Sequence, residues 1–311
     1  MKQKESIFQR PLFVALFALS AALGWGFAFP LVKLGFAEFG IEADMTASKM
    51  LFAGMRFCVA GIFILISAKI SGLSFRLQGR GSAAHILAFA LMNTTIHYAL
   101  FYIGISHSQG SRASVVNSLG VFLIVILACI FFESDKFDKR KVIGCVLGLS
   151  GIAMMNIGGA ASGGFTFMGD GMIILNTTCS AIAGLMTRGL SKRCNIIVAT
   201  GYSLAIGGAL LIIPALLFGA TLPSITAKGV TYLFLLICIS SFGFGLYNKL
   251  LSCNPIGRVA IFNSLIPIIG TTSSCIILHE PFYPKYAIAL LLTSLGIFVI
   301  NYHSRDAIKK A

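Results

Sequence analysis

Residues 112–119, RASVVNSL, recur as residues 258–265, RVAIFNSL, at an offset of 146 residues. Each stretch has an arginine, four intervening residues and then Asn-Ser-Leu, and each lies in strongly apolar sequence. Further along, residues 151–156, GIAMMN, recur as residues 296–301, GIFVIN. Because the two matches follow each other in the same order, they predict that the chain contains a duplicated unit.

The apolar content predicts a membrane protein. Hydrophobic residues make up 57% of the chain and charged residues 11%, whereas soluble domains carry about 25% charged residues. A helix needs about 20 mostly apolar residues to cross a bilayer. Ten segments meet or approach that length: residues 12–36, 47–70, 83–106, 113–132, 142–158, 169–190, 196–218, 229–250, 256–278 and 286–302. Their near-continuous apolar runs favour helices over barrel strands, so the predicted fold class is all-α and polytopic.

The ten predicted helices divide into two repeats of five, residues 11–158 and 168–303. A Gly/Ser-rich stretch at 158–164 is the expected linker between them. Since five is odd, the second repeat must cross the membrane in the opposite sense. Inverted repeats of this kind build two interchangeable gates around one site in many secondary transporters. Transport is therefore the leading functional hypothesis.

The distribution of positive charge predicts the orientation. The net charge is +14, but Lys and Arg lie between apolar segments and form no clustered patch for nucleic acid. With the N-terminus in the cytoplasm, 18 Lys and Arg residues fall on the inner side and 5 on the outer side, with Arg56 inside the second helix. The positive-inside rule thus predicts cytoplasmic N- and C-termini in a multi-pass protein of the inner or plasma membrane.

Other functional classes have less support. The eight cysteines form no CxxC pair, so neither a metal nor a cofactor is expected. A membrane enzyme would need a nucleophile with a base, or paired aspartates, within a span. The only aspartate in any predicted span is Asp170, at the rim of the sixth. A receptor function does not explain an inverted duplication. An ion channel predicts a repeated filter loop or a charged ring, and neither is visible in the sequence.

Polar side chains inside apolar spans are the candidate substrate contacts, because lipid tolerates them only when they are partnered or face water. The candidate lining is Trp25, Asn93, His97, Tyr98, Asn117, Ser118, Asn176, Ser180, Tyr247, Asn263 and Ser264. The alternative for a serine is a hydrogen bond to its own helix backbone, and for an asparagine a structural bond between helices. His97 is either a proton-coupling or substrate-binding group, or a neutral packing histidine. Trp25 sits mid-helix, which fits a cavity role or plain packing.

Basic residues at the ends of predicted helices, with Arg56 inside the second, have two interpretations. Snorkelling to lipid headgroups explains most of them. Alternatively, one receives a substrate carboxylate or phosphate. The residues concerned are Lys33, Arg56, Arg112, Arg188 and Arg258.

Helices five and ten carry small residues close to one face, which lets helix backbones approach closely in lipid. Those residues are Gly144, Gly148, Gly151, Ala289, Thr293 and Gly296. With almost no polar residues in either span, we expect these helices to be scaffold or subunit-contact helices, in a homodimer if the chain forms one.

Several motifs resemble an EamA domain of the drug/metabolite transporter superfamily. They are Trp25-Gly26-Phe27-Ala28-Phe29 with Lys33, Arg56-Phe57 with Ala60-Gly61, Ser118-Leu119 running to Glu133, and Ser264-Leu265-Ile266-Pro267 running to Glu280. In the second half, Ser180 and Arg188 stand roughly where Trp25 and Lys33 stand in the first. Where the family often has a proline in helix four, this chain has Val121.

The resemblance implies two EamA units in ten helices, and movement of small metabolites through a central cavity. We therefore expect alternating access, with export of an amino acid or similar small polar or amphipathic metabolite favoured. The alternative is an uptake permease for a metabolite or a quaternary amine, which aromatic faces could hold. Helices three, four, eight and nine are the expected gates, with Pro267 allowing one of them to bend.

Overall fold

A computed structural model describes residues 7–79, 81–132, 137–154, 164–254 and 259–302. All the regular elements in these residues are helical, and they form ten spans that cross the molecule. The first five are α1 (Pro11–Phe39), α2 (Thr46–Ile70), α3–η2–α4 (Ser82–Ala90, Leu91–Thr95, Ile96–Ser106), α5–α6 (Gly110–Asn117, Leu119–Phe131) and α7 (Lys139–Met154). The second five are η4–α8 (Phe167–Gly171, Met172–Leu190), α9 (Ile196–Leu217), α10 (Ala227–Cys253), η5–α12 (Ile261–Leu265, Ile266–Ile277) and α13 (Pro284–Tyr302).

Seven of the spans among the described residues are long and apolar enough to cross a bilayer, with mean hydropathies between 1.5 and 2.6. The ninth span is a shorter apolar helix, Ile261–Ile277. The predicted all-helical, polytopic architecture is confirmed. Most of the predicted Gly/Ser linker, Glu133, Arg258 and the side chain of Arg188 lie outside the described residues.

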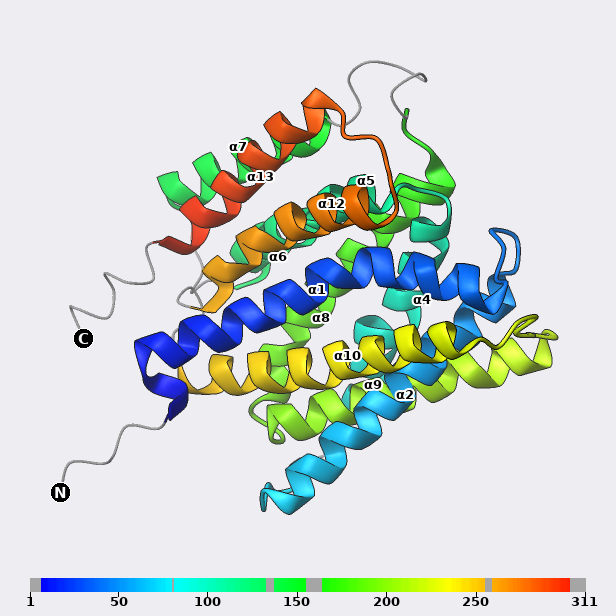
Figure 1. The fold of residues 1–311 in the computed structure, drawn as a ribbon. Coiled ribbons are helices and arrows are strands. Elements are labelled where there is room, and N and C mark those ends of the chain that lie inside the picture. The colour runs from blue at the N-terminus through cyan, green and yellow to red at the C-terminus, as the bar shows by residue number, and fades with distance from the viewer. Residues whose placement is uncertain (1–6, 80, 133–136, 155–163, 255–258, 303–311) are drawn as a thin grey trace.

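The connections between spans alternate between two ends of the bundle. The start of α1 and the end of α13 lie at the same end, on the left in Figure 1, which we call the proximal end. There Gln78 N donates to Arg193 O at 2.8 Å, which joins two connections. At the opposite, distal end, Ser224 N donates to Phe39 O at 3.2 Å. The spans therefore cross the bundle an even number of times, because the first span starts and the last span ends at the same end.

Helix pairing repeats when the two halves are exchanged. The second span, α2, packs against the seventh, α9, and the fifth, α7, packs against the tenth, α13. The first span, α1, packs against α10 and α12, just as the sixth span packs through α8 against α4 and α6. When the numbers of the two halves are exchanged, each of these helix pairs becomes itself or another observed pair, as expected for two related halves.

Glycines bring α7 and α13 into backbone contact. A Cβ atom added at Gly144 would lie 2.8 Å from the carbonyl oxygen of Gly296, and one added at Gly296 would lie 2.5 Å from that of Gly144. Only glycine fits at such a distance, because a real Cβ atom needs more than 3.0 Å. The close approach expected at the small residues of helices five and ten occurs between these two helices, and the pair lies at one side of the bundle (Figure 1).

Several spans are irregular near the predicted polar residues. Span three contains a π-helical turn at Leu91–Thr95, span four breaks between α5 and α6 at Ser118, and span nine begins with the 3-10 turn Ile261–Leu265. Such turns are frequently found where a helix bends or carries a functional group. Pro267 follows the 3-10 turn at the start of α12 and favours a bend there.

Candidate functional site

One cluster of predicted site residues joins spans three, four and six. Asn176 on α8 donates from Nδ2 to Oδ1 of Asn117 on α5 at 2.8 Å. On α4, Nδ1 of His97 lies 3.2 Å from the carbonyl oxygen of Asn176. The His97 ring meets the Tyr98 ring edge-on, with centroids 4.3 Å apart. Four of the eleven predicted residues therefore lie together in an amide–aromatic group, which we call the first cluster.

A second cluster joins spans one, eight and nine. Asn263 on η5 donates from Nδ2 to the hydroxyl of Tyr247 on α10 at 2.8 Å. The Tyr247 ring lies edge-on to Trp25 of α1, with centroids 5.0 Å apart, and Phe244 lies 5.6 Å from the same tryptophan. The second cluster thus contains three predicted residues and, like the first, an asparagine held against aromatic rings.

Exchange of the two halves relates the clusters. The first takes spans three and four from one half and span six from the other, and the second takes spans eight and nine and span one. Buried polar atoms nearly always have a hydrogen-bond partner. Yet Nε1 of Trp25, Oδ1 of Asn176 and Oδ1 of Asn263 are buried with no partner among the described residues. Each cluster therefore keeps hydrogen-bonding capacity that a polar guest could use.

The remaining predicted residues lie elsewhere. Asn93 donates to Ser203 Oγ on α9 at 2.9 Å, a bond between helices. Ser118 and Ser264 donate to carbonyl oxygens of their own helices, at 2.6 and 2.7 Å. Ser180 on α8 is exposed and has no contact with either cluster among those given for the described residues. Ser118 and Ser264 thus follow the backbone-bonding interpretation, and the asparagines carry the interhelical contacts.

Arg56 is buried in the aromatic core and does not reach the headgroups. Its side chain on α2 is part of a residue only 3% exposed. Nε donates to Ser240 Oγ at 2.8 Å and to the carbonyl oxygen of Leu236 at 3.2 Å, and Nη1 donates to the Tyr102 hydroxyl at 3.1 Å. Arg56 therefore ties α2 to α4 and α10 through neutral acceptors.

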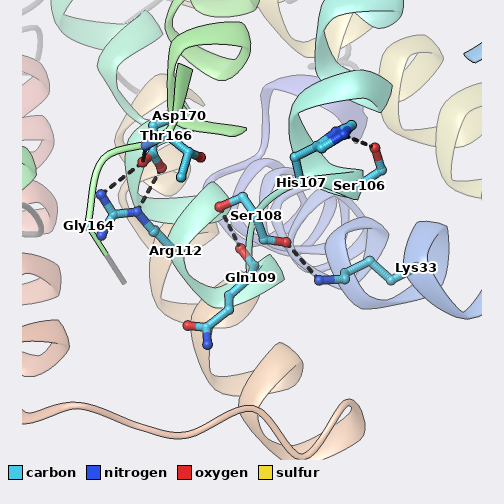
Figure 2. Close-up of a pocket in the computed structure, with 9 residues that line it drawn as sticks. All are labelled: Lys33, Ser106, His107, Ser108, Gln109, Arg112, Gly164, Thr166 and Asp170. Atoms are coloured by element: carbon cyan, nitrogen blue, oxygen red, sulfur yellow. Dashed lines mark hydrogen bonds and ion pairs between the residues drawn. The ribbon is translucent and has the colours of Figure 1, made fainter. Parts of the chain in front are cut away.

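A polar cavity of about 390 Å³ lies at the distal end, among α1, the connection from α4 to α5, and the start of span six (Figure 2). The described residues that line it are Lys33, Ser106, His107, Ser108, Gln109, Arg112, Gly164, Thr166 and Asp170. None of the eleven predicted site residues is among these nine. The cavity is therefore a vestibule at one end of the bundle, apart from the two clusters.

One wall of the vestibule is an ion pair. Arg112 Nε donates to Asp170 Oδ1 at 2.7 Å, and Nη2 donates to Oδ2 at 2.9 Å, as Figure 2 shows. Both side chains are at most 5% exposed. The backbone N–H of Thr166 also donates to Asp170, at 3.1 Å. Snorkelling is therefore wrong for Arg112: its guanidinium forms a bidentate pair that joins the start of span four to the start of span six.

A second ion pair lies at the same end. Lys33 Nζ lies 3.3 Å from Glu280 Oε1 and donates to the carbonyl oxygen of Ser108 at 2.7 Å. Glu280 also accepts from the backbone N–H groups of Gly110 at 2.8 Å and Ser111 at 2.9 Å, and from the Ser111 hydroxyl at 2.7 Å. A carboxylate is well placed there, since a helix N-terminus carries unpaired N–H groups and partial positive charge.

These contacts set the ionisation of Glu280. Burial favours the protonated form, but the hydrogen bonds from Ser111 and Gly110 and the charge of Lys33 outweigh it, so the pKa of Glu280 lies below its usual value. Among the described residues, Cys275 and Tyr286 are further titratable groups that interact with its charge. Glu280 is therefore ionised at neutral pH.

Sequence reasoning named Lys33, Arg112, Asp170 and Glu280 but did not pair them. Lys33 and Glu280 are 247 residues apart, and Arg112 and Asp170 are 58 apart, in different spans. The available signal was charge: each pair brings together opposite charges that lie at helix ends on the same predicted side of the membrane.

Comparisons with known proteins agree with this architecture. The model of the EamA-like transporter family matches residues 12–157 and 167–302. The chain is 27% identical over 298 residues to the uncharacterized transporter YvbV of Bacillus subtilis, covering 94% of this chain and 92% of the relative. It is 23% identical over 301 residues to a probable amino-acid metabolite efflux pump of Salmonella typhimurium, covering 91% and 92%.

A solved crystal structure superposes with a TM-score of 0.67 at 17% identity, covering 94% of this chain and 98% of the other, which shows a shared fold. The family model covers two consecutive units and nearly the whole chain, in agreement with the two halves seen in the helix pairing. The chain therefore belongs to the EamA-like transporter family, as a multi-pass membrane transporter.

Proposed function

We propose that this transporter exports an amino acid, or a metabolite of similar size and polarity, across the cytoplasmic membrane. The observation that carries the proposal is the pair of related amide–aromatic clusters, each built from both halves of the chain. Their unpaired polar atoms suit a small guest with its own donors and acceptors. The names of the relatives from Salmonella typhimurium and Escherichia coli, probable amino-acid metabolite efflux pumps, favour the same substrate class.

The proposed mechanism is alternating access between two halves, residues 11–158 and 168–303. In this structure spans four and nine meet near the distal end, where Ser114 Oγ lies 2.9 Å from Thr271 Oγ1 and donates to the carbonyl oxygen of Pro267 at 3.3 Å. Thr271 in turn donates to the carbonyl oxygen of Ser111 at 3.0 Å. Separation of spans four and nine at this end would open the path from the clusters to the vestibule.

The proposed orientation places the distal end outside the cell. Its support is the excess of Lys and Arg on the side that holds both termini. The distal closure then corresponds to a state in which the path to the outside is blocked, and export ends with its opening. We further propose that α7 and α13 take no part in the path and form the subunit contact if the chain dimerises.

An uptake permease for a quaternary amine is the second candidate. The rings of Trp25, Tyr247 and Tyr98 favour it, because aromatic faces attract cations in a desolvated site. A carboxylate-bearing substrate and a cationic one are separable by measuring which compounds exchange through the protein.

The test is counterflow in liposomes after a thermal-shift screen of amino acids, nucleosides, sugars and quaternary amines. Radiolabelled compounds that stabilise the protein are then assayed with Asn117→Ala and Asn263→Ala. Asn301→Ala is the matched control, since Asn301 donates to its own helix on α13. We expect exchange to fall at least about tenfold in the first two variants, as for the loss of polar contacts worth about 1.4 kcal/mol or more. Equal exchange in all three would remove the clusters from the path.

A further inference from the structure

We infer that Glu280 is the latch of the distal gate, holding spans one, four and nine together through Lys33 and the N-terminus of α5. The inference rests on the proposed alternating access and adds the residues that close one side. Glu280 belongs to the second half, whereas Lys33, Gly110 and Ser111 belong to the first. One carboxylate therefore bridges the two halves by four hydrogen bonds.

The local sequence explains why Glu280 lies outside a helix, beside the N-terminus of α5. Helix α12 ends at Ile277, and Pro281 follows Glu280, which disfavours a helical conformation for the glutamate. His279, between them, adopts φ = 53°, a left-handed conformation that is uncommon for residues other than glycine. Strained residues persist where surrounding contacts hold them. Here the strained residue directly precedes the carboxylate that caps a helix of the other half.

The groups of the latch are ones that water can solvate when the contact breaks. The Lys33 side chain is 28% exposed and borders the vestibule, while that of Glu280 is 9% exposed. Water already reaches Lys33 in the closed state, and it solvates both ions when they separate, so separation leaves neither charge without a partner. The two backbone N–H groups of α5 are likewise able to bond water instead. Opening of the distal end therefore exchanges this network for hydration.

The two ion pairs at the distal end hold span four against different partners. The Arg112–Asp170 pair is more deeply buried and links two helices at their starts. The Lys33–Glu280 contact lies on the other side of the α5 N-terminus and is the one that reaches span nine. Opening between spans four and nine breaks the latch and leaves the Arg112–Asp170 pair intact.

The test uses a cysteine placed directly beneath the latch. Ser274 on α12 is fully buried, and its Oγ would lie 2.7 Å from a Cβ atom added at Gly110. In a background with the native cysteines replaced, Ser274→Cys is a near-isosteric reporter for opening. Its modification by a water-soluble maleimide is measured in lipid nanodiscs, where both faces are reachable and no substrate is needed.

Glu280→Gln and Lys33→Met should each raise the modification rate about tenfold, which corresponds to about 1.4 kcal/mol. Glu38→Gln is the matched control: Glu38 also lies at the distal end, bonded to Thr226, and its variant should keep the parental rate. The double variant of Lys33 and Glu280 should react no faster than Glu280→Gln alone, because one latch is broken in both.

Parental rates in Glu280→Gln, with an unchanged melting temperature, would overturn the latch. Independent, multiplying effects of the two substitutions would overturn the pairing of Lys33 with Glu280. Should Glu280→Gln fail to fold, Glu280→Asp keeps the charge but withdraws it from the α5 N–H groups, and the same rates decide. Because labelling needs no transported compound, a failed latch is distinguishable from a failed transport assay.

Discussion

Replacement of Arg112 by methionine should destabilise the fold far more than a surface substitution. Methionine fills a similar volume but cannot bond Asp170, whose carboxylate is 4% exposed. Among the described residues, the backbone N–H of Thr166 would then remain as the hydrogen-bond donor to Asp170. Removing one member of a buried ion pair costs about 3–5 kcal/mol, because the other charge stays buried without its partner.

The double variant separates the cost of leaving the Asp170 charge buried without a partner from the net contribution of the ion pair to stability. Replacing a buried pair by apolar residues of similar volume is often neutral or stabilising. Arg112→Met with Asp170→Leu should therefore recover at least half of the loss caused by Arg112→Met alone. Such non-additivity is expected of side chains in direct contact.

The assay is unfolding by SDS in mixed micelles, followed by the fluorescence of Trp25, the only tryptophan in the chain. Arg140→Met, at an exposed residue of α7, is the control and should change the free energy of unfolding by no more than about 0.5 kcal/mol. A cost below about 1 kcal/mol for Arg112→Met, or a double variant as unstable as the two single losses added, would refute the reasoning.

Acidification should open the distal end only below the normal glutamate range. Since the pKa of Glu280 is lowered in the closed state, its contribution is complete above the open-state pKa, near the usual value of about 4.3, and is lost as the pH falls through the closed-state value. The Ser274→Cys rate, divided by that of a free thiol, should thus be flat from about pH 8 to about pH 5.5, and a step near the histidine pKa of about 6.5 would assign opening to another group. Gly144→Val should cost about 1–3 kcal/mol in the SDS assay, because its side chain would overlap α13, whereas Gly189→Val, with open space around it, should cost little; equal values would contradict the backbone contact. If His97 couples protons, His97→Gln should abolish pH-driven accumulation and leave exchange intact, and unchanged gradient-driven transport would exclude that role.

The spans and their inverted pairing were predictable because both leave local signals. Apolar length defines a crossing, and the recurrence of Arg112–Leu119 as residues 258–265 marked the duplication. The small residues of α7 and α13 were recognisable as points of close backbone approach, since glycines at helical spacing have few other uses in an apolar span. In each case the decisive property belongs to a segment and does not depend on which segment it meets.

Partner choice was not predictable. Asn117 and Asn176 bond each other only because spans four and six are adjacent, which no local pattern encodes. Ser180 was expected beside them, but one helix carries several faces, and its rotation in the bundle is set by packing. The vestibule was missed for the same reason: its walls come from three segments far apart in sequence, joined by charges whose pairing depends on the fold.

Paired distance measurements between spin labels test alternating access most directly. One pair, at the exposed residues His107 and Phe282, reports the distal end, and the other, at exposed Phe131 and Lys192, reports the proximal end; each pair joins the two halves. We predict that a transported compound, or Glu280→Gln, lengthens the distal distance while the proximal distance shortens. Distances that stay fixed, or that lengthen together at both ends, would contradict two halves that rock around one site.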